Sequence, residues 1–145
     1  MESKTNNKSA SSVENEADSV VITVIVDVSY TGEGGNANYA SVGDYQYSCV
    51  PSVVHVTKPG TVISYQMSPQ VGAEFVFTGL YSSDSLYKPQ LSKHPRITSN
   101  GRAIETTHAN TEAMLINVAL QVQDVAKQSS ISCDPQVTND PNPSW

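Results

Sequence analysis

Two Asp-Pro bonds, Asp134–Pro135 and Asp140–Pro141, carry the most unusual chemistry in this 145-residue chain. An aspartate carboxylate can reach its own backbone carbonyl carbon and close a five-membered ring. The proline nitrogen belongs to a tertiary amide with a weak planar preference, and it leaves readily once it is protonated. The pattern therefore points to a peptide bond that the chain itself can cut, although Asp-Pro is also common at turns that end strands.

A fold that promotes this cut would hold Asp134 in an attack geometry that an unfolded chain visits rarely. A second carboxyl group with a raised pKa can protonate the leaving nitrogen or activate water. The candidates for this second group are Asp124 and Asp140. Because Asp124 continues the apolar parity of the segment before it, we expect burial to raise its pKa.

Other site chemistries fit the sequence less well. Blue-copper sites take His, Cys and Met ligands, with Cys, His and Met in one loop near the C-terminus, but neither His nor Met follows Cys133. A Gly-x-Ser-x-Gly nucleophile motif is also absent. We therefore predict no metal and no cofactor. We interpret Cys49 and Cys133 as small buried side chains that stay reduced in the cytoplasm, while an oxidising compartment would permit a disulfide.

Alternating apolar and polar residues predict the elements that position these groups. The clearest strands are residues 19–30, 113–125 and 131–137, with a helix as the alternative for the second. Shorter strands are predicted at residues 45–49, 53–57, 61–67, 73–81, 96–99 and 103–107. Asn100-Gly101 between the last two is a hairpin signal. Such strands suggest a β-sandwich or barrel, and we predict one all-β sandwich of immunoglobulin or cupredoxin type over residues 19–145.

The composition of the chain indicates which binding partners and which cellular compartment to expect. Residues 1–18 are almost entirely polar, which predicts a disordered tail or an arm that orders on assembly. Eight Lys and Arg residues stand against fourteen Asp and Glu, for a net charge of −6, so nucleic acid and anionic membranes are not expected partners. The sequence contains neither a signal-type apolar stretch nor a membrane-length apolar run. We therefore predict a cytoplasmic protein.

The tail resembles the DP-EP family, which is named for an Asp-Pro and a Glu-Pro dipeptide. Asp134–Pro135 matches the first dipeptide, and Asp140–Pro141 stands in place of the second. The resemblance extends over residues 20–141, through Val24–Asp27, Lys58–Gly60 and Leu115–Val118.

The resemblance implies a β-sandwich that cuts its own Asp-Pro bond and keeps the C-terminal piece as a strand. It also implies self-assembly and an Asp–Lys covalent link at the cut. The amine for such a link would come from Lys127, Lys93, Lys88 or Lys58.

Our leading hypothesis is an autoproteolytic, aspartic-type endopeptidase acting on its own Asp134–Pro135 bond. Asp134 is the nucleophile or the acid that coordinates water, and Asp124 or Asp140 is the general acid/base. Lys127 is the candidate covalent partner, and edge strands would mediate a homo-oligomer. The rival hypothesis is a non-enzymatic, self-assembling or ligand-binding sandwich in which Asp-Pro only forms a turn.

Overall fold

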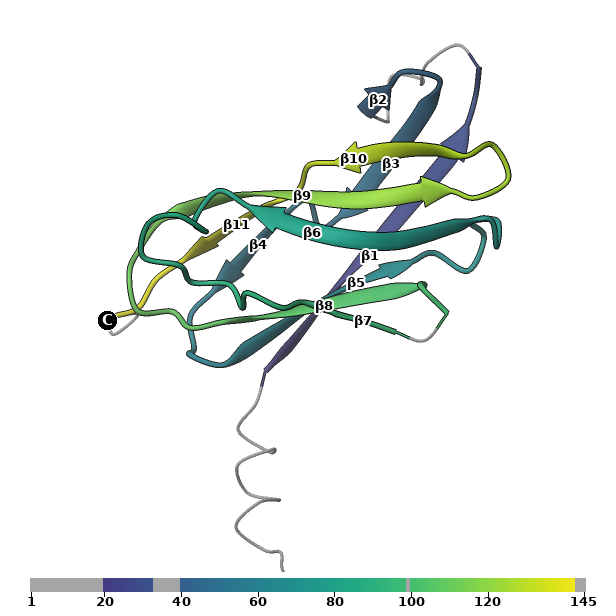
Figure 1. Cartoon of the computed structure of the whole chain (residues 1–145). Helices are drawn as coiled ribbons and strands as arrows, with labels where there is room; N and C mark the ends of the chain where they lie inside the picture. Colours follow the sequence, from purple (N-terminus) through teal and green to yellow (C-terminus); the bar gives the residue numbers. More distant parts are fainter. Residues whose placement is uncertain (1–19, 33–39, 99, 143–145) are drawn as a thin grey trace, which may run out of the picture.

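The computed structural model describes residues 20–32, 40–98 and 100–142 (Figure 1). Within these ranges the chain forms β-strands and no helix, so the all-β prediction is confirmed and the helical alternative for residues 113–125 is wrong. The tail or arm predicted at residues 1–18 lies outside the described residues.

Two sheets pack against each other. Six strands form the first sheet, in the spatial order β2 (Ala40–Val42), β3 (Tyr45–Val50), β1 (Val21–Tyr30), β5 (Thr61–Met67), β8 (Ala103–His108) and β7 (Arg96–Ile97). The second sheet has the order β10 (Ser129–Cys133), β9 (Leu115–Asp124), β11 (Gln136–Asn139) and β4 (Val53–Val56), with β6 (Phe75–Ser82) also paired to β9. Figure 1 shows the strands of the two sheets crossing obliquely, as expected for a sandwich of twisted sheets.

Strand direction is mixed in both sheets. β1 pairs in parallel with β5, and β11 pairs in parallel with β4. The other strand pairs are antiparallel. Each sheet therefore contains one parallel strand pair among antiparallel pairs. A parallel pair cannot be joined by a tight hairpin and requires a longer crossover connection.

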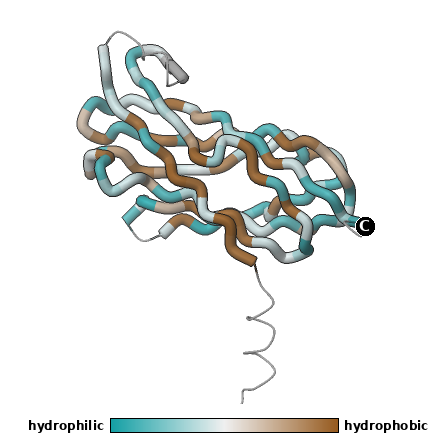
Figure 2. Tube along the Cα trace, turned by 180° about the vertical axis from the view of Figure 1, so that it is seen from behind, coloured by the Kyte–Doolittle hydropathy of each residue, from teal (hydrophilic) through white to brown (hydrophobic). Residues whose placement is uncertain are grey.

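The core lies between the two inner faces, where the sequence alternation places apolar side chains. On β1 the buried residues are Val24, Val26 and Val28, and on β9 they are Ile116, Val118, Leu120 and Val122. Each such side chain contributes about 1.5–3 kcal/mol when it is taken out of water. Figure 2 shows hydrophobic residues concentrated along the strands, with hydrophilic residues in many of the connecting loops.

The hairpin predicted at Asn100-Gly101 is confirmed. β7 and β8 pair antiparallel around it, with Gly101 at φ 73° and the Gly101 N–H donating to the Thr98 carbonyl at 2.9 Å. A Cβ added at Gly101 would lie 2.8 Å from the Val76 Cβ. Glycine is therefore needed here for both its backbone conformation and the space it leaves.

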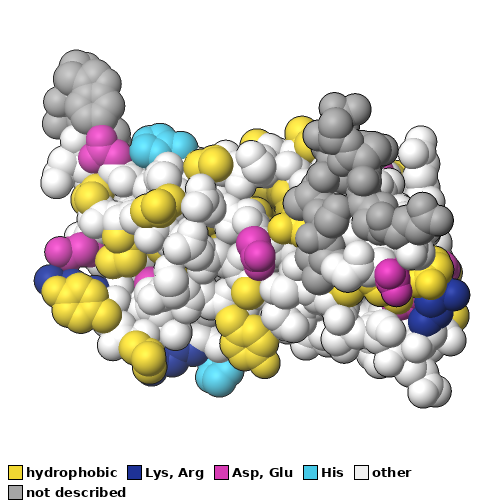
Figure 3. Space-filling model, turned by 90° about the horizontal axis from the view of Figure 1, so that it is seen from above, with side chains coloured by type: hydrophobic (Ala, Val, Ile, Leu, Met, Phe, Trp, Pro, Cys, Tyr) yellow, Lys and Arg dark blue, Asp and Glu magenta, His cyan; other side chains and the backbone are white. Residues whose placement is uncertain are grey.

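The face of the molecule drawn in Figure 3 carries few charged side chains. In Figure 3, charged side chains are scattered, and the exposed hydrophobic side chains form small separate groups. The low charged fraction of the chain, 15%, accounts for this appearance. No helix in the described residues has both the length and the apolar character needed to cross a membrane.

Candidate functional site

The Asp134–Pro135 bond lies inside what is in effect one long strand. Cys133 at the end of β10 is opposite Leu120 on β9, and Gln136 at the start of β11 is opposite Asn117. The register is therefore continuous along β9, and Pro135 falls opposite Val118. The two short strands are separated only by Asp134 and Pro135, at the point where the chain passes from β10 to the position between β9 and β4.

Pro135 is buried and fixed on both sides. Its carbonyl oxygen accepts a hydrogen bond from the Val118 N–H at 3.0 Å, and the next N–H, that of Gln136, donates to the Ser52 carbonyl at 2.9 Å. Opposite residues in an antiparallel pair of this kind normally exchange two hydrogen bonds. Proline has no N–H, so the Val118–Pro135 pair makes only one. The ladder is incomplete at the Pro135 nitrogen.

Asp134 is exposed, on the other side of the same peptide bond. The Ser132 hydroxyl donates to the Asp134 carboxylate Oδ1 at 3.1 Å, since residues two apart on a strand share a face. The Asp134 N–H donates to the Tyr47 hydroxyl at 3.3 Å. Tyr47 belongs to β3 of the opposite sheet, so the site joins the two layers of the sandwich.

Two buried thiols flank this site. Cys49 on β3 and Cys133 on β10 are both buried and free, as expected from the sequence. Burial, together with the nearby Asp134 charge, raises the pKa of Cys49 to about 12. Burial, followed by the charges of Cys49 and Asp134, also raises the pKa of Cys133. Both thiols are therefore protonated near neutral pH and are poor nucleophiles.

Asp124 and Lys127 lie at the other end of the β9–β10 hairpin. Asp124 is buried, as predicted, and its Oδ2 accepts a hydrogen bond from the Tyr45 hydroxyl at 2.9 Å. Asp124 lies opposite Ser129 on β10, and Asp134 follows Ser129 by five residues. At ~3.3 Å per residue, about 16 Å of strand therefore separates Asp134 from the level of Asp124. The Lys127 ammonium lies 4.3 Å from the centre of the Tyr30 ring. The structure does not bring Asp124 or Lys127 beside Asp134.

Asp140 is distant from Asp134 in the opposite direction. It follows β11, where its N–H donates to the Val56 carbonyl at 2.8 Å and its Oδ1 accepts from the Asn142 N–H at 2.9 Å. About 20 Å of extended chain separates it from Asp134 at ~3.3 Å per residue. The three aspartates predicted from the sequence therefore lie at three different levels along the length of the second sheet and do not gather at one point.

The other lysines considered from the sequence have contacts elsewhere. Lys88 pairs with Glu112 at 3.2 Å, and Lys93 lines a pocket beside β6. Lys58 lies in the turn between β4 and β5, where its carbonyl accepts from the Thr61 hydroxyl. The ion pairs found in the described ranges, Lys88–Glu112 and Arg96–Glu105, do not include Asp134.

The comparison with known families fits this arrangement. The model of the DP-EP family matches residues 18–141, which is most of the chain and includes both Asp-Pro bonds. The chain belongs to the DP-EP family. The comparison with curated proteins finds no match. In this DP-EP protein the first dipeptide is the interruption between β10 and β11, and the second follows β11 directly.

Sequence reasoning missed two residues at the DP-EP site, Tyr47 and Ser132. Ser132 was in principle detectable, because it precedes Asp134 by two positions and therefore shares its face of the strand. Tyr47 had no local signal, because it comes from a strand of the other sheet, far away in the sequence.

A buried polar cluster holds the far end of β11. Asn139 is 7% exposed, and its side-chain amide donates to the Asn110 Oδ1 at 2.8 Å and to the Glu112 carbonyl at 2.9 Å. Its Oδ1 accepts from the Met114 N–H at 3.0 Å. The Asn110 side chain in turn donates to the Asp140 carbonyl at 3.1 Å. β11 is therefore anchored by side-chain bonds as well as by both of its neighbouring strands.

His108 contacts this cluster through Asn110. It is fully buried, and its Nδ1 accepts a hydrogen bond from the Asn110 N–H at 2.9 Å, which requires an unprotonated Nδ1. Burial lowers the pKa of His108 below its ordinary value, while the Asp84 carboxylate acts in the opposite direction. Protonation of the imidazole at Nδ1 would place two donors against each other and break this contact.

We expect a drop in stability as the pH falls from about 7.5 to 5, because the unfolded chain then takes up a proton on His108 that the folded protein resists. The loss begins near the ordinary histidine pKa of about 6.5 and continues through the lower folded value. Urea unfolding at several pH values measures it. His108→Gln should flatten this part of the curve, whereas His94→Gln, at an exposed site, should not. Equal slopes in the His108→Gln variant and the wild type would contradict the assignment.

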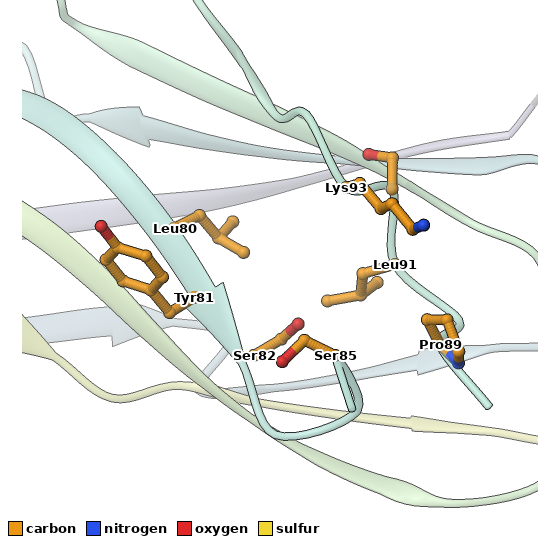
Figure 4. Close-up of a pocket in the computed structure, with 8 residues that line it drawn as sticks. Leu80, Tyr81, Ser82, Ser85, Pro89, Leu91 and Lys93 are labelled. Carbon is orange, nitrogen blue, oxygen red and sulfur yellow. The ribbon is translucent and has the colours of Figure 1, made fainter. Parts of the chain in front are cut away.

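Surface hollows occur away from the DP-EP site. One, of about 160 Å³, lies between β6 and the following loop, and Figure 4 shows Leu80 and Leu91 facing each other across it, with the Ser82 and Ser85 hydroxyls at one end. The residues that line it do not include Asp134, Pro135 or Tyr47. In the described ranges, His, Cys, Asp and Glu side chains form no group of three or more that could hold a metal ion.

Proposed function

We propose that this DP-EP protein is a self-cleaving endopeptidase that hydrolyses its own Asp134–Pro135 bond and retains β11 in the sheet. The observation that carries the proposal is the contrast across one peptide bond. Asp134 is exposed and open to water, whereas Pro135 is buried with its carbonyl bonded to Val118. A fixed leaving side and a nucleophile beside its own carbonyl are what an intramolecular cut requires.

Asp134 acts in this reaction as the nucleophile. One oxygen of its carboxylate attacks its own backbone carbonyl carbon, and the bond to the Pro135 nitrogen breaks, which leaves a cyclic anhydride. Water then opens the anhydride and restores the carboxylate, with a new C-terminus at residue 134. The Ser132 hydroxyl binds Oδ1 at 3.1 Å and restricts the rotation of the side chain. Because the Asp134 carboxylate is itself the nucleophile, the reaction needs no second carboxylate at the site.

The incomplete ladder favours the cut state. Cleavage converts the Pro135 nitrogen from a tertiary amide into a secondary amine that carries hydrogen. The Val118 carbonyl, which lacks its usual partner in the pair, is placed to accept from this amine. A hydrogen bond gained in this way contributes on the order of 1 kcal/mol to the cut protein.

The contacts of β11 account for retention of the cut segment. Val137 is fully buried, and β11 is bonded to β9 on one edge and to β4 on the other. The segment from Pro135 onward is thus a central strand held by backbone bonds, one core side chain and the Asn139 anchor. We expect the two pieces to remain together after the bond between them is cut.

The proposal is tested by comparing folded and unfolded chains at the same pH. Purified protein is incubated at pH 7 with and without urea, and the products are identified by mass and by N-terminal sequencing. Because the fold sets the geometry, we expect a new N-terminus at Pro135 in the folded sample and a much slower cut in urea. Equal rates in both samples would assign the cut to the ordinary lability of Asp-Pro and not to this protein's structure.

An assembly role without cleavage is the second candidate. It is favoured by large apolar side chains exposed around β6 and the loop after it, where Tyr81 is 67%, Leu86 98% and Tyr87 69% exposed. This role takes a second copy of the chain as partner, in the cytoplasmic setting expected from the sequence. Size-exclusion chromatography tests it. A stable oligomer of uncut chains that Asp134→Asn leaves unchanged would favour assembly over self-cleavage.

A further inference from the structure

The proposed cut requires a proton for the leaving nitrogen of Pro135, and the carboxylates considered from the sequence do not lie beside it. Asp124 is bonded to Tyr45 at the distant hairpin turn, and Asp140 lies beyond the end of β11. We propose that the Tyr47 phenol donates this proton. The inference rests on the proposed self-cleavage and assigns a catalytic role to a residue of the opposite sheet.

The position of the Tyr47 hydroxyl is the first support. Its oxygen accepts the Asp134 N–H at 3.3 Å. The Pro135 nitrogen is one residue further along the extended chain, about 3.5 Å from that amide nitrogen. Because the phenol oxygen is the acceptor in the Asp134 contact, its own hydrogen remains available for a second acceptor. The phenol therefore presents a proton one peptide unit from the leaving group.

The protonation state of Tyr47 is the second support. Burial raises the pKa of this phenol, the Asp134 N–H bond lowers it, and electrostatic interactions, first with the Asp134 carboxylate and then with Cys133 and Cys49, raise it. The net effect is a pKa above the ordinary tyrosine value, so the phenol carries its hydrogen throughout the neutral range. Asp134 and Cys133 face it from the β10 end of the other sheet, and Cys49 lies on its own strand.

The proton balance closes with water as the only other reactant. The Asp134 carboxylate adds to its own carbonyl carbon, and the former amide nitrogen becomes a basic amine. As the carbon–nitrogen bond breaks, the phenol proton passes to the Pro135 nitrogen. Of the two hydrogens of the water that opens the anhydride, one returns as a proton to the Tyr47 phenolate and the other passes from the new carboxylic acid to the Pro135 amine. One water molecule is consumed, and Tyr47 ends in its starting form.

Tyr47→Phe tests the inference, because it removes only the hydroxyl oxygen. We expect the cleavage rate to fall about 100-fold or more, within the range found for general acid catalysis. The wild-type rate should also decline at alkaline pH, and because the pKa of Tyr47 is raised, this decline should begin above the ordinary phenol value of about 10. This alkaline decline should be absent in Tyr47→Phe. A purely structural role of the phenol would not produce this difference between the two pH profiles.

Tyr45→Phe is the matched control on the same strand. It removes the phenol that binds Asp124 at the other end of the hairpin, and we expect it to cut at the wild-type rate. If Tyr47→Phe cuts as fast as the wild type, the inference is overturned and the proposed self-cleavage stands. If the folded wild type is not cut at all, both are overturned. If Tyr45→Phe, and not Tyr47→Phe, slows the cut, proton donation by Tyr47 is overturned in favour of the Asp124 end.

Discussion

Asp134→Asn should abolish the cut between residues 134 and 135. The substitution keeps the size and shape of the side chain but replaces the carboxylate nucleophile with a weakly nucleophilic amide. Correct positioning of a reacting group is worth several powers of ten in rate, so we expect a decrease of at least about a thousandfold. Because Asp134 is exposed and its Oδ1 accepts from the neighbouring Ser132 hydroxyl, a bond that an amide oxygen can also accept, the fold should be unaffected. Intact mass over several days measures the result.

Two further substitutions sharpen this prediction. Asp134→Glu keeps the charge and changes the ring that must close from five members to six, so it separates the need for a carboxylate from the need for its geometry. Asp140→Asn alters the second Asp-Pro bond, about 20 Å along the strand, and should cut at the wild-type rate. A wild-type rate in Asp134→Asn, or loss of cleavage only in Asp140→Asn, would remove Asp134 from the mechanism.

Asn139→Ala should release the C-terminal segment once the bond is cut. The Asn139 side chain makes hydrogen bonds of 2.8 Å, 2.9 Å and 3.0 Å to Asn110, Glu112 and Met114. Removing it leaves one buried and two partly buried partners unpaired, at a cost of about 2–3 kcal/mol. This cost corresponds to weakening the retention of the segment by roughly 30- to 150-fold. Size-exclusion chromatography of the cut protein, followed by mass analysis of the main peak, measures retention.

Gln136→Ala is the control for this release. Gln136 lies on the same strand, but its side chain makes an exposed hydrogen bond to Asn117, so its loss should have little effect on retention. The prediction also applies to uncut chains, for which Asn139→Ala should lower the free energy of unfolding by about 2–3 kcal/mol. Equal stability of the Asn139→Ala and Gln136→Ala variants would contradict the role of the cluster around Asn139.

The sequence was a good guide where one strand face meets the core. Val24, Val26 and Val28 share one parity of the strand, opposite to that of Thr23, Asp27 and Ser29, and they are buried as the pattern predicts. The same rule placed Asp124 on the buried side of its strand, and it is 2% exposed. Alternation fixes which face a side chain takes, because the period of an extended strand is two residues.

The same alternation carries no information about how far apart two carboxylates lie. Asp124 and Asp134 are close in the sequence, but the hairpin between them places one at the turn and the other near the middle of the β9 edge. Tyr47 shows the converse, because its contact with Asp134 depends on how the two sheets stack. Sheet stacking is set by the whole core and has no signature in the local sequence.

The central claim is tested most directly by the mass of the freshly purified wild-type chain under denaturing conditions, after incubation near neutral pH. Self-cleavage at Asp134–Pro135 predicts two masses that sum to the full chain plus one water, the smaller belonging to residues 135–145. The same sample under native conditions should show one complex of both pieces. A single full-length mass that persists for days would contradict the account.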